Sequence, residues 1–503
     1  MGVFARVGRR FFLWPRRTPA VKLVKTRNQE TARMDSNITE QLQLTLEAQR
    51  RAFMAAPMPS AEVRRERLTR LRAMLAKYAD EITTAVSQDF GSRSPRESLL
   101  ADVFTCESGA KHAIKQLGKW MKVRRIPTAL QFAPARNRLM PQPVGVVGVI
   151  SPWNYPIYMA LGPAIGAIAA GNRVMLKPSE LTPITSALLA KMVAEFFTPE
   201  EMTVVTGDAN VARIFSSLPF NHLVFTGSTQ VGKLVAQAAA ANLTPVTLEL
   251  GGKSPVVVQA DADLAQVAER LAYGKLLNAG QTCIAPDYVL APKAMVEPLA
   301  QAVLANMRRM YPTITGNADY TSVATQRHLD RLQEIVADAE ARGARVLKSH
   351  DDANDGRKLT PHLLLNVNED MRVMREEIFG PLLPIVGVDS ADEAIQYIQR
   401  HERPLAMYWF GRDSAGRDKL LRETHAGGVT VNDCIWHIGQ EDQPFGGVGA
   451  SGQGAYHGIW GFNAMSHLKP VFHQTTLFAG TKLFQPPYGA VFDKMLSLLR
   501  KIA

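Results

Sequence analysis

The feature that most constrains the fold is a series of short β-branched runs that starts at Val144 and is interleaved with segments of helical apolar spacing. The runs of this first series are Val144–Ile150, Arg173–Leu176, Met202–Val205, His222–Phe225, Val246–Leu250 and Pro255–Val258. Strands that alternate with helices are typical of βαβ units. We therefore expect an α/β protein with a parallel sheet.

A second series of such runs indicates another α/β domain in the C-terminal half. Its members are Asp287–Ala291, Leu382–Val388, Ala406–Phe410 and Gly428–Val431. The first hundred residues favour helices instead. Ser60 opens the clearest one, whose apolar face carries Leu68, Leu71, Leu75, Tyr78 and Ile82. A basic, Pro-rich stretch near residues 120–143 is interpreted as an extended excursion from the core.

The positive charge is concentrated at the N-terminus. The formal net charge is +12, and residues 1–33 hold nine basic side chains against the single acid Glu30, which leaves +4 for the rest. We therefore expect no nucleic-acid partner. The tail is interpreted as a disordered leader, with Met34 as the true start. Arg9-Arg10 is similar to a twin-arginine signal, but no apolar region follows it, so export is not expected.

Composition also argues against a membrane span and a disulfide scaffold. The charge-free stretch Leu139–Asn172 is long enough to cross a bilayer but contains five prolines, which favours a buried strand, loop and helix. The C-terminal tail, 481–503, is amphipathic, and we expect it to pack on protein. Three cysteines in 503 residues fit a reducing compartment, and we expect a cytoplasmic protein. We identify no metal-ligating motif.

Two segments are candidates for binding a nucleotide cofactor. Gly227, Ser228 and Gly232 lie between an expected strand and an expected helix, where backbone N–H groups approach a phosphate. A plain tight turn would give the same pattern. Lys177 and Glu180 follow another strand, at the edge where open α/β sheets bind ligands, and they suit ribose hydroxyls. A surface ion pair is the alternative for these two.

Three residues together indicate nucleophilic chemistry. Cys283 lies in a Gly-Gln-Thr-Cys segment that is a candidate nucleophile loop, whereas Cys106 and Cys434 have no such setting. Glu249 is an acid within an apolar strand end, where loss of water raises the pKa of a carboxyl and suits it to act as a general base. The amide of Asn154 is a neutral donor for an oxyanion.

Seven motifs resemble the NAD(P)-dependent aldehyde dehydrogenase superfamily. They are VGVISPWNYP at 147–156, MLKPSE at 175–180, FTGSTQVG at 225–232, LELGGKSP at 248–255, GQTC at 280–283, EEIFGP at 376–381 and PFGGVGASGQG at 444–454. Gly449 replaces a lysine of the general motif, as in the class 3 branch. The segments 431–437, 456–458 and 469–472 also resemble that branch and, within it, bacterial coniferyl aldehyde dehydrogenases.

The resemblance implies a role for each candidate residue. Cys283 would attack the aldehyde, Asn154 would hold the oxyanion, and Glu249 would activate water against the thioester. The implied cofactor is NAD, with NADP accepted, bound by Trp153, Lys177, Glu180, Gly227, Ser228, Gly232, Glu377 and Phe379. The implied substrate pocket contains Tyr155, Trp436, His437 and Phe445, which suits an aromatic or long apolar aldehyde.

The resemblance also implies an organisation of the chain. It predicts a Rossmann-type cofactor domain, an α/β catalytic domain and a small β bridging element in a homodimer. The expected segments are a leader at 1–33, the cofactor domain at 34–121 and 144–250, bridging strands at 122–143 and 466–480, the catalytic domain at 251–465 and a tail at 481–503.

Several alternative functions stay open at this point. A fatty aldehyde dehydrogenase would share the whole mechanism. A CoA-acylating enzyme would not need the base Glu249, and a cysteine acyl hydrolase would need a histidine partner for Cys283. A catalytically silent protein on the same fold would have no reason to keep a buried carboxylate.

Overall fold

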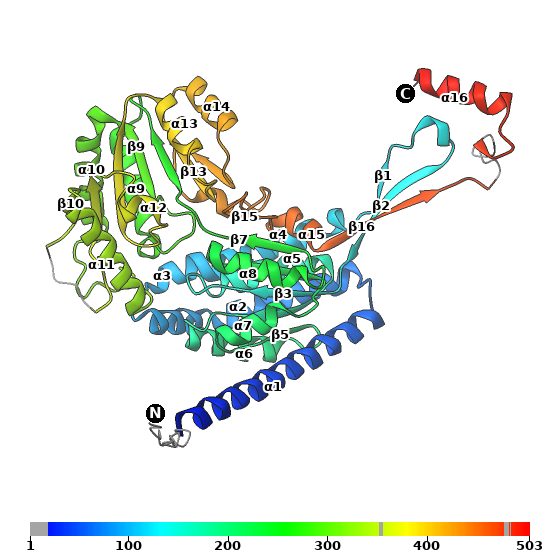
Figure 1. Ribbon diagram of the computed structural model, residues 1–503, viewed down its shortest axis with the longest axis horizontal. Coiled ribbons are helices and arrows are strands. Elements are labelled where there is room, and N and C mark those ends of the chain that lie inside the picture. The colour runs from blue at the N-terminus through cyan, green and yellow to red at the C-terminus, as the bar shows by residue number, and fades with distance from the viewer. Residues whose placement is uncertain (1–18, 352–355, 477–481, 483, 503) are drawn as a thin grey trace, which may run out of the picture.

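The computed structural model describes residues 19–351, 356–476, 482 and 484–502. The described residues form two α/β bodies, each built on one sheet, and a three-stranded antiparallel arm that projects from them (Figure 1). No helix among these residues is long and apolar enough to cross a membrane.

The first body contains a six-stranded sheet in the order β15-β7-β6-β3-β4-β5. Its strands are β3 (Val146–Ile150), β4 (Arg173–Lys177), β5 (Met202–Val204), β6 (His222–Thr226), β7 (Val246–Glu249) and β15 (Gly452–Gln453). All neighbours are parallel except β15, which runs antiparallel to β7. The predicted parallel sheet is confirmed. The strand order reverses between β3 and β6, and a crevice at such a reversal is where α/β sheets bind ligands.

Helices cover both faces of this sheet. They are α1 (Pro19–Ala55), α2 (Ala61–Phe90), α3 (Pro95–Ser98), the π-helical η1 (Leu99–Phe104), α4 (Thr105–Trp120), α5 (Tyr158–Ala170), α6 (Pro183–Phe196), α7 (Ala209–Ser216) and α8 (Thr229–Ala240). The predicted start of α2 is confirmed, because the Ser60 side chain caps it by accepting the N–H of Val63. Its apolar face joins α4 and α5 in one core cluster.

The second body contains a seven-stranded sheet in the order β10-β11-β12-β9-β8-β13-β14. Its strands are β8 (Pro255–Val258), β9 (Tyr288–Pro292), β10 (Arg345–Lys348), β11 (His362–Leu365), β12 (Leu382–Val388), β13 (Ala406–Phe410) and β14 (Gly428–Val431). Its helices are α9 (Leu264–Leu276), η3 (Leu277–Gly280), η4 (Lys293–Met295), α10 (Val296–Met310), α11 (Gln326–Ala341), α12 (Arg372–Arg375), α13 (Ala391–Gln399), α14 (Ser414–Glu423) and η5 (Trp436–Gly439). Only the edge strand β10 is antiparallel to its neighbour in this described sheet.

The projecting arm joins two distant parts of the chain. It consists of β1 (Arg124–Ile126), β2 (Arg136–Pro143) and β16 (Ser466–His473), with the short η2 (Leu130–Phe132) in the connection. The long pairing of β2 with β16 runs from Pro143 opposite Ser466 to Arg136 opposite His473. Figure 1 shows the arm leading away from both bodies, with α16 (Ala490–Ile502) beyond its tip.

Two expectations differ from the structure. Helix α1 begins at Pro19, so the stretch 19–33 of the expected disordered leader is helical; residues 1–18, with Arg9 and Arg10, lie outside the described residues. The expected end of the catalytic domain at 465 is too late, because β15 adds to the first sheet and α15 (Gly458–Ala464) packs on α5. The described residues of α16 include no buried side chain, and the expectation that the tail packs on protein stays a prediction.

Candidate active site

Four segments with candidate site residues leave the first sheet at the same edge. In the strand register Ile150 lies beside Lys177 on one side and Phe225 on the other, and Thr226 lies beside Glu249. Since the strands are parallel, the segments that follow β3, β4, β6 and β7 all begin at the carboxyl edge of the sheet. The predicted cofactor and catalytic segments are thereby brought together.

The nucleophile loop is held in a tightly bonded turn. Asn278 and Ala279 have left-handed backbone conformations, with φ of 52° and 50°. The Asn278 side-chain amide donates to the carbonyl of Gln281 at 3.2 Å. The Gln281 amide donates in return to the carbonyl of Asn278 at 3.0 Å and to that of Ser322 at 3.0 Å. Cys283, two residues later, is therefore presented by a rigid support.

Cys283 is partly buried and its environment disfavours the thiolate. Burial raises the pKa of the thiol to about 12, and the negative charges of Glu377 and Glu249 act in the same direction. This raised pKa favours the neutral thiol form of Cys283 near pH 7. The same environment limits side reactions of the nucleophile, because the thiolate is the reactive form.

Glu249 ends β7 as a buried carboxyl. It is 2% exposed, and neither of its carboxyl oxygens has a hydrogen-bond partner among the described residues. Burial raises its pKa well above the ordinary value for glutamate. A carboxyl with two free acceptor positions, next to a nucleophile, is suited to bind and deprotonate a water molecule.

Asn154 lies in the turn between β3 and α5 with its amide aimed at the nucleophile loop. The side chain is buried, and its Nδ2 donates to the carbonyl of Gln281 at 3.2 Å. An Asn side chain has two N–H donors, so one remains for another acceptor. Its own backbone carbonyl accepts from Arg93 at 3.0 Å and from Asn278 at 2.9 Å.

The turn between β6 and α8 presents the beginning of a helix to the crevice. Ser228 caps α8 by accepting the N–H of Val231. A Cβ on Gly232 would lie 2.5 Å from the Leu250 side chain, so this position needs glycine for α8 to approach the β7 end. The N-terminus of α8 therefore offers N–H groups and a positive dipole end to a phosphate.

Lys177 and Glu180 lie at the neighbouring strand end. Lys177 is 1% exposed and its ammonium donates to the carbonyl of Pro178 at 2.7 Å. The same nitrogen lies 3.7 Å from the half-exposed carboxylate of Glu180. Burial lowers the pKa of Lys177. The ion pair that was the alternative interpretation is present, although its lysine is buried, and both side chains keep donor and acceptor capacity for ribose hydroxyls.

Glu377 and Phe379 reach the crevice from the second body. A Cβ on Gly251 would lie 2.1 Å from a carboxyl oxygen of Glu377, so glycine at 251 is what admits that carboxyl. Burial and the charge of Asp287 raise the pKa of Glu377 to about 7. Phe379 meets the Trp153 ring edge-on at 5.5 Å, and Trp153 also stacks on His328 at 4.9 Å.

These residues fit a dinucleotide. A helix N-terminus faces the crevice at the strand-order reversal, a lysine and a glutamate lie beside it, and the carboxyl oxygen Glu377 Oε1 has no hydrogen-bond partner among the described residues. Together they supply phosphate, ribose and aromatic-ring contacts.

A mostly apolar cavity of about 230 Å³ opens onto Cys283. It lies between η1, α4 and α5 on one side and α9, η3 and η5 on the other. The lining residues are Leu100, Ala101, Phe104, Thr105, Ser108, Tyr155, Tyr158, Met159, Tyr273, Leu277, Thr282, Cys283, Ile284, Ile435, Trp436, Ile438, Gly439, Gln440 and Glu441. Trp436 stacks on Tyr273 at 6.0 Å, so the cavity wall includes a flat aromatic surface.

Two of the four predicted pocket residues line this cavity and two do not. Tyr155 and Trp436 are in its wall. His437 and Phe445 stack on each other at 6.0 Å, and Phe445 also stacks on His457, so they form packing behind the wall. His437 follows Trp436 directly within η5, so these two side chains point to different sides, whereas Phe445 lies in the segment after η5.

Several residues near the site were not predicted. Arg93, Asn278 and Gln281 hold the backbone around Asn154 and Cys283. Gln281 could have been found from the sequence, because it lies in the GQTC motif. Asn278 could have been found as an asparagine in a turn, since asparagine often adopts left-handed backbone conformations there. The sequence did not indicate that Arg93 is buried, because an arginine among serines in a polar loop is normally exposed.

Comparison with known proteins agrees with this geometry. Residues 18–471 match the profile of the aldehyde dehydrogenase family. A probable coniferyl aldehyde dehydrogenase of Caulobacter vibrioides is 49% identical over 461 residues, 90% of this chain and 95% of the relative. A coniferyl aldehyde dehydrogenase of Pseudomonas sp. (strain HR199) is 46% identical over 465 residues, 92% and 96% of the two chains. The substrate-bound structure of Staphylococcus aureus AldH superposes with a TM-score of 0.86 at 35% identity, covering 91% of this chain and 99% of the other.

Proposed function

This chain belongs to the aldehyde dehydrogenase family, and on that premise we propose that it oxidises coniferaldehyde or a related aromatic aldehyde to the carboxylic acid. The observation that carries the substrate class is the apolar cavity that ends at Cys283 and includes the stacked pair Trp436 and Tyr273. Such a surface matches a flat ring better than a flexible chain.

In the proposed reaction the Cys283 thiol first loses its proton to water. The thiolate then attacks the aldehyde carbonyl, and the carbonyl π electrons move to oxygen to give a thiohemiacetal anion. The oxyanion is held by the free N–H of the Asn154 amide and by the backbone N–H of Cys283, the arrangement that stabilises developing negative charge. NAD(P), when bound, supplies a hydride acceptor. Loss of hydride from the thiohemiacetal carbon leaves a thioester on Cys283.

Glu249 completes the reaction by hydrolysis. Its carboxylate takes a proton from water, the resulting hydroxide adds to the thioester carbonyl, and the Cys283 thiolate leaves as the acid forms. Glu249 must be ionised for this step, and its raised pKa places the step under pH control.

We propose NAD as the preferred cofactor. Lys177 and Glu180 would hold the adenosine ribose, and Gly227, Ser228 and Gly232 the pyrophosphate. Glu377 and Phe379 would lie at the nicotinamide ribose and ring, with Trp153 beside Phe379. A carboxylate at Glu180 accepts from a 2′-hydroxyl and repels a 2′-phosphate.

The deciding experiment compares NADH formation from coniferaldehyde, benzaldehyde and octanal, with Cys283→Ala as the control. The proposal expects the highest kcat/KM with coniferaldehyde and no turnover in the control. A highest value with octanal would assign an aliphatic substrate and keep the mechanism. If no NADH formed with any of the three aldehydes unless CoA was added, the enzyme would be of the acylating kind, and the proposed role of Glu249 would be contradicted.

We also propose a homodimer in the cytoplasm. In the described part of the chain β16 is an edge strand of the projecting arm, and Phe472 on it is half exposed, which favours pairing with a second copy. A catalytic thiol that must stay reduced, such as that of Cys283, is maintained in a reducing compartment. A monomeric mass in solution scattering would contradict the dimer.

A further inference from the structure

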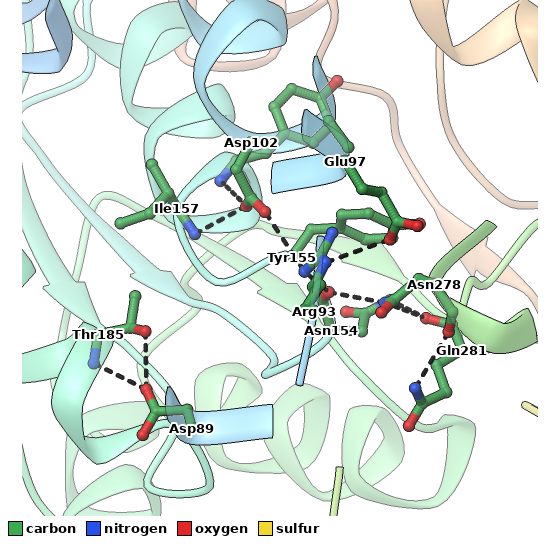
Figure 2. Close-up of polar contacts among 12 residues, drawn as sticks. Asp89, Arg93, Glu97, Asp102, Asn154, Tyr155, Ile157, Thr185, Asn278 and Gln281 are labelled. Carbon is green, nitrogen blue, oxygen red and sulfur yellow. Dashed lines mark hydrogen bonds and ion pairs between the residues drawn. The ribbon is translucent and has the colours of Figure 1, made fainter. Parts of the chain in front are cut away.

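A buried cation with two buried carboxylates lies directly behind Asn154. The Arg93 side chain is fully buried, in the connection between α2 and α3. Its Nε lies 3.2 Å from the Glu97 carboxylate and its Nη1 3.4 Å from that of Asp102 (Figure 2). Removing three charged groups from water is unfavourable, so their contacts must offset a large loss of hydration.

The cluster fixes the turn that carries Asn154 from both ends. Arg93 Nη1 donates to the backbone carbonyl of Asn154 at 3.0 Å. Asp102 Oδ1 accepts the N–H groups of Ile157 at 3.1 Å and Tyr158 at 3.0 Å, where α5 begins. A cation on the carbonyl and an anion on the N–H groups of the helix start are both charge-assisted hydrogen bonds, the stronger kind.

The same cluster also controls the face of the turn that looks toward the nucleophile loop. The Arg93 guanidinium lies 4.7 Å from the centre of the Tyr155 ring, and the Tyr155 hydroxyl is 2.7 Å from the Thr282 hydroxyl. Figure 2 shows Arg93 between the carboxylates and the Asn154 carbonyl, with Asn278 and Gln281 on the far side. Any shift of Arg93 would therefore move the Asn154 amide relative to Cys283.

We propose that Arg93 is a positioning residue for the reaction, acting through the Asn154 carbonyl to hold the side-chain amide where the oxyanion forms. This inference rests on the proposed function, since it assumes that the amide serves the oxyanion. Arg93 itself touches neither reacting atoms nor substrate cavity. Its effect on the rate is therefore expected only while the Asn154 amide is present.

The test is a double-mutant cycle with Arg93→Lys, Asn154→Ala and the combined variant, assayed for NADH formation. Loss of one oxyanion donor lowers kcat by roughly 10²–10³-fold, so we expect that loss for Asn154→Ala and about a tenfold to hundredfold loss for Arg93→Lys. The combined variant is expected to match Asn154→Ala within about threefold, because the group being positioned is already gone. The KM for NAD is expected to stay unchanged.

Arg96→Lys is the matched control, since Arg96 lies three residues further on but is exposed, and its ion pair within the described residues is with Asp319 at 3.7 Å. It is expected to keep the wild-type kcat. Circular dichroism and the rate of Cys283 alkylation by iodoacetamide, which forms no oxyanion, check that each variant has a folded site.

Each outcome decides between positioning and a purely structural role. The inference would be overturned if the fold-loss of kcat in the combined variant equalled the product of the two single losses. An unchanged kcat in Arg93→Lys would overturn it as well. If Arg93→Lys does not fold, Glu97→Gln takes its place in the cycle, with a loss of about threefold to tenfold that must vanish in the Asn154→Ala background. A wild-type enzyme that oxidises no aldehyde would instead refute the proposed function.

Discussion

The contact between the nucleophile loop and the Glu377 loop makes Gly280 sensitive to the addition of a single methyl group. Gly280 has a φ of 76°, in the left-handed region. A Cβ built there would lie 2.3 Å from the carbonyl oxygen of Gly380 and 3.1 Å from that of Lys275. The perturbation we consider is Gly280→Ala.

The size of the effect follows from these distances. A carbon and a carbonyl oxygen approach to about 3.3 Å, so the two loops must separate by about 1 Å. Alanine in a left-handed conformation adds about 1–2 kcal/mol and overpacking about 1–3 kcal/mol, so we expect a destabilisation of about 2–5 kcal/mol. A displacement of about 1 Å at a reacting group lowers the rate about a hundredfold.

The assay is kcat for coniferaldehyde together with the apparent melting temperature, at a temperature where Gly280→Ala is folded. Gly343→Ala is the control, because Gly343 also has positive φ, 92°, but a Cβ there would meet no atom of the described residues within 4 Å. The control is expected to lose only about 1–2 kcal/mol and to keep wild-type kcat. A folded Gly280→Ala enzyme with kcat within threefold of wild type would refute the reasoning.

Four further predictions follow from the ionisable groups. Glu249→Gln keeps the size of the side chain but cannot accept a proton, so only the hydrolysis step should be slowed. Stopped-flow should show an intact first burst of NADH and a steady-state rate lower by about 10²–10⁴-fold. Absence of the burst would place the action of Glu249 before hydride transfer. In the wild type the hydrolytic rate should rise with pH, because the raised pKa of Glu249 keeps it protonated at lower pH, and Glu249→Gln should flatten that profile. Alkylation of Cys283 in the cofactor-free enzyme should accelerate about tenfold per pH unit from about pH 7 to about pH 9, since its pKa is about 12; a plateau near neutral pH would contradict that pKa. Glu180→Gln should raise kcat/KM for NADP relative to NAD by about tenfold, and an unchanged ratio would remove Glu180 from cofactor selection.

Local sequence determined the elements and their ends to a large extent. The β-branched runs around Val146, Val174 and Val224 became the central parallel strands, because a strand buried on both faces must be apolar throughout. Ser60 predicted the start of α2, because a serine at that position caps the helix. The burial of Glu249 followed from its apolar neighbours in the strand, and the direction of its pKa followed from the burial.

The wall of the substrate cavity was harder to predict. Tyr155 and Trp436 line it, but His437 and Phe445 pack behind it. The remaining wall comes from segments without a motif, such as Phe104 of the π-helical η1. The packing of separate helices decides which side chains of a short turn line the cavity. Residue type alone does not predict that packing.

The sequence by itself determined which chemistry is available, because a cysteine loop, a buried acid and an amide each have a short motif whose local pattern fixes the strand or turn around them. Only the tertiary structure decided how these groups are held. The carbonyl of Asn154 is bound by Arg93 from 61 positions away, and its amide meets Gln281 across 127 positions. Contacts over such separations depend on how buried surfaces pack, and the burial of the Arg93 cation is stable only because that packing delivers two carboxylates to it.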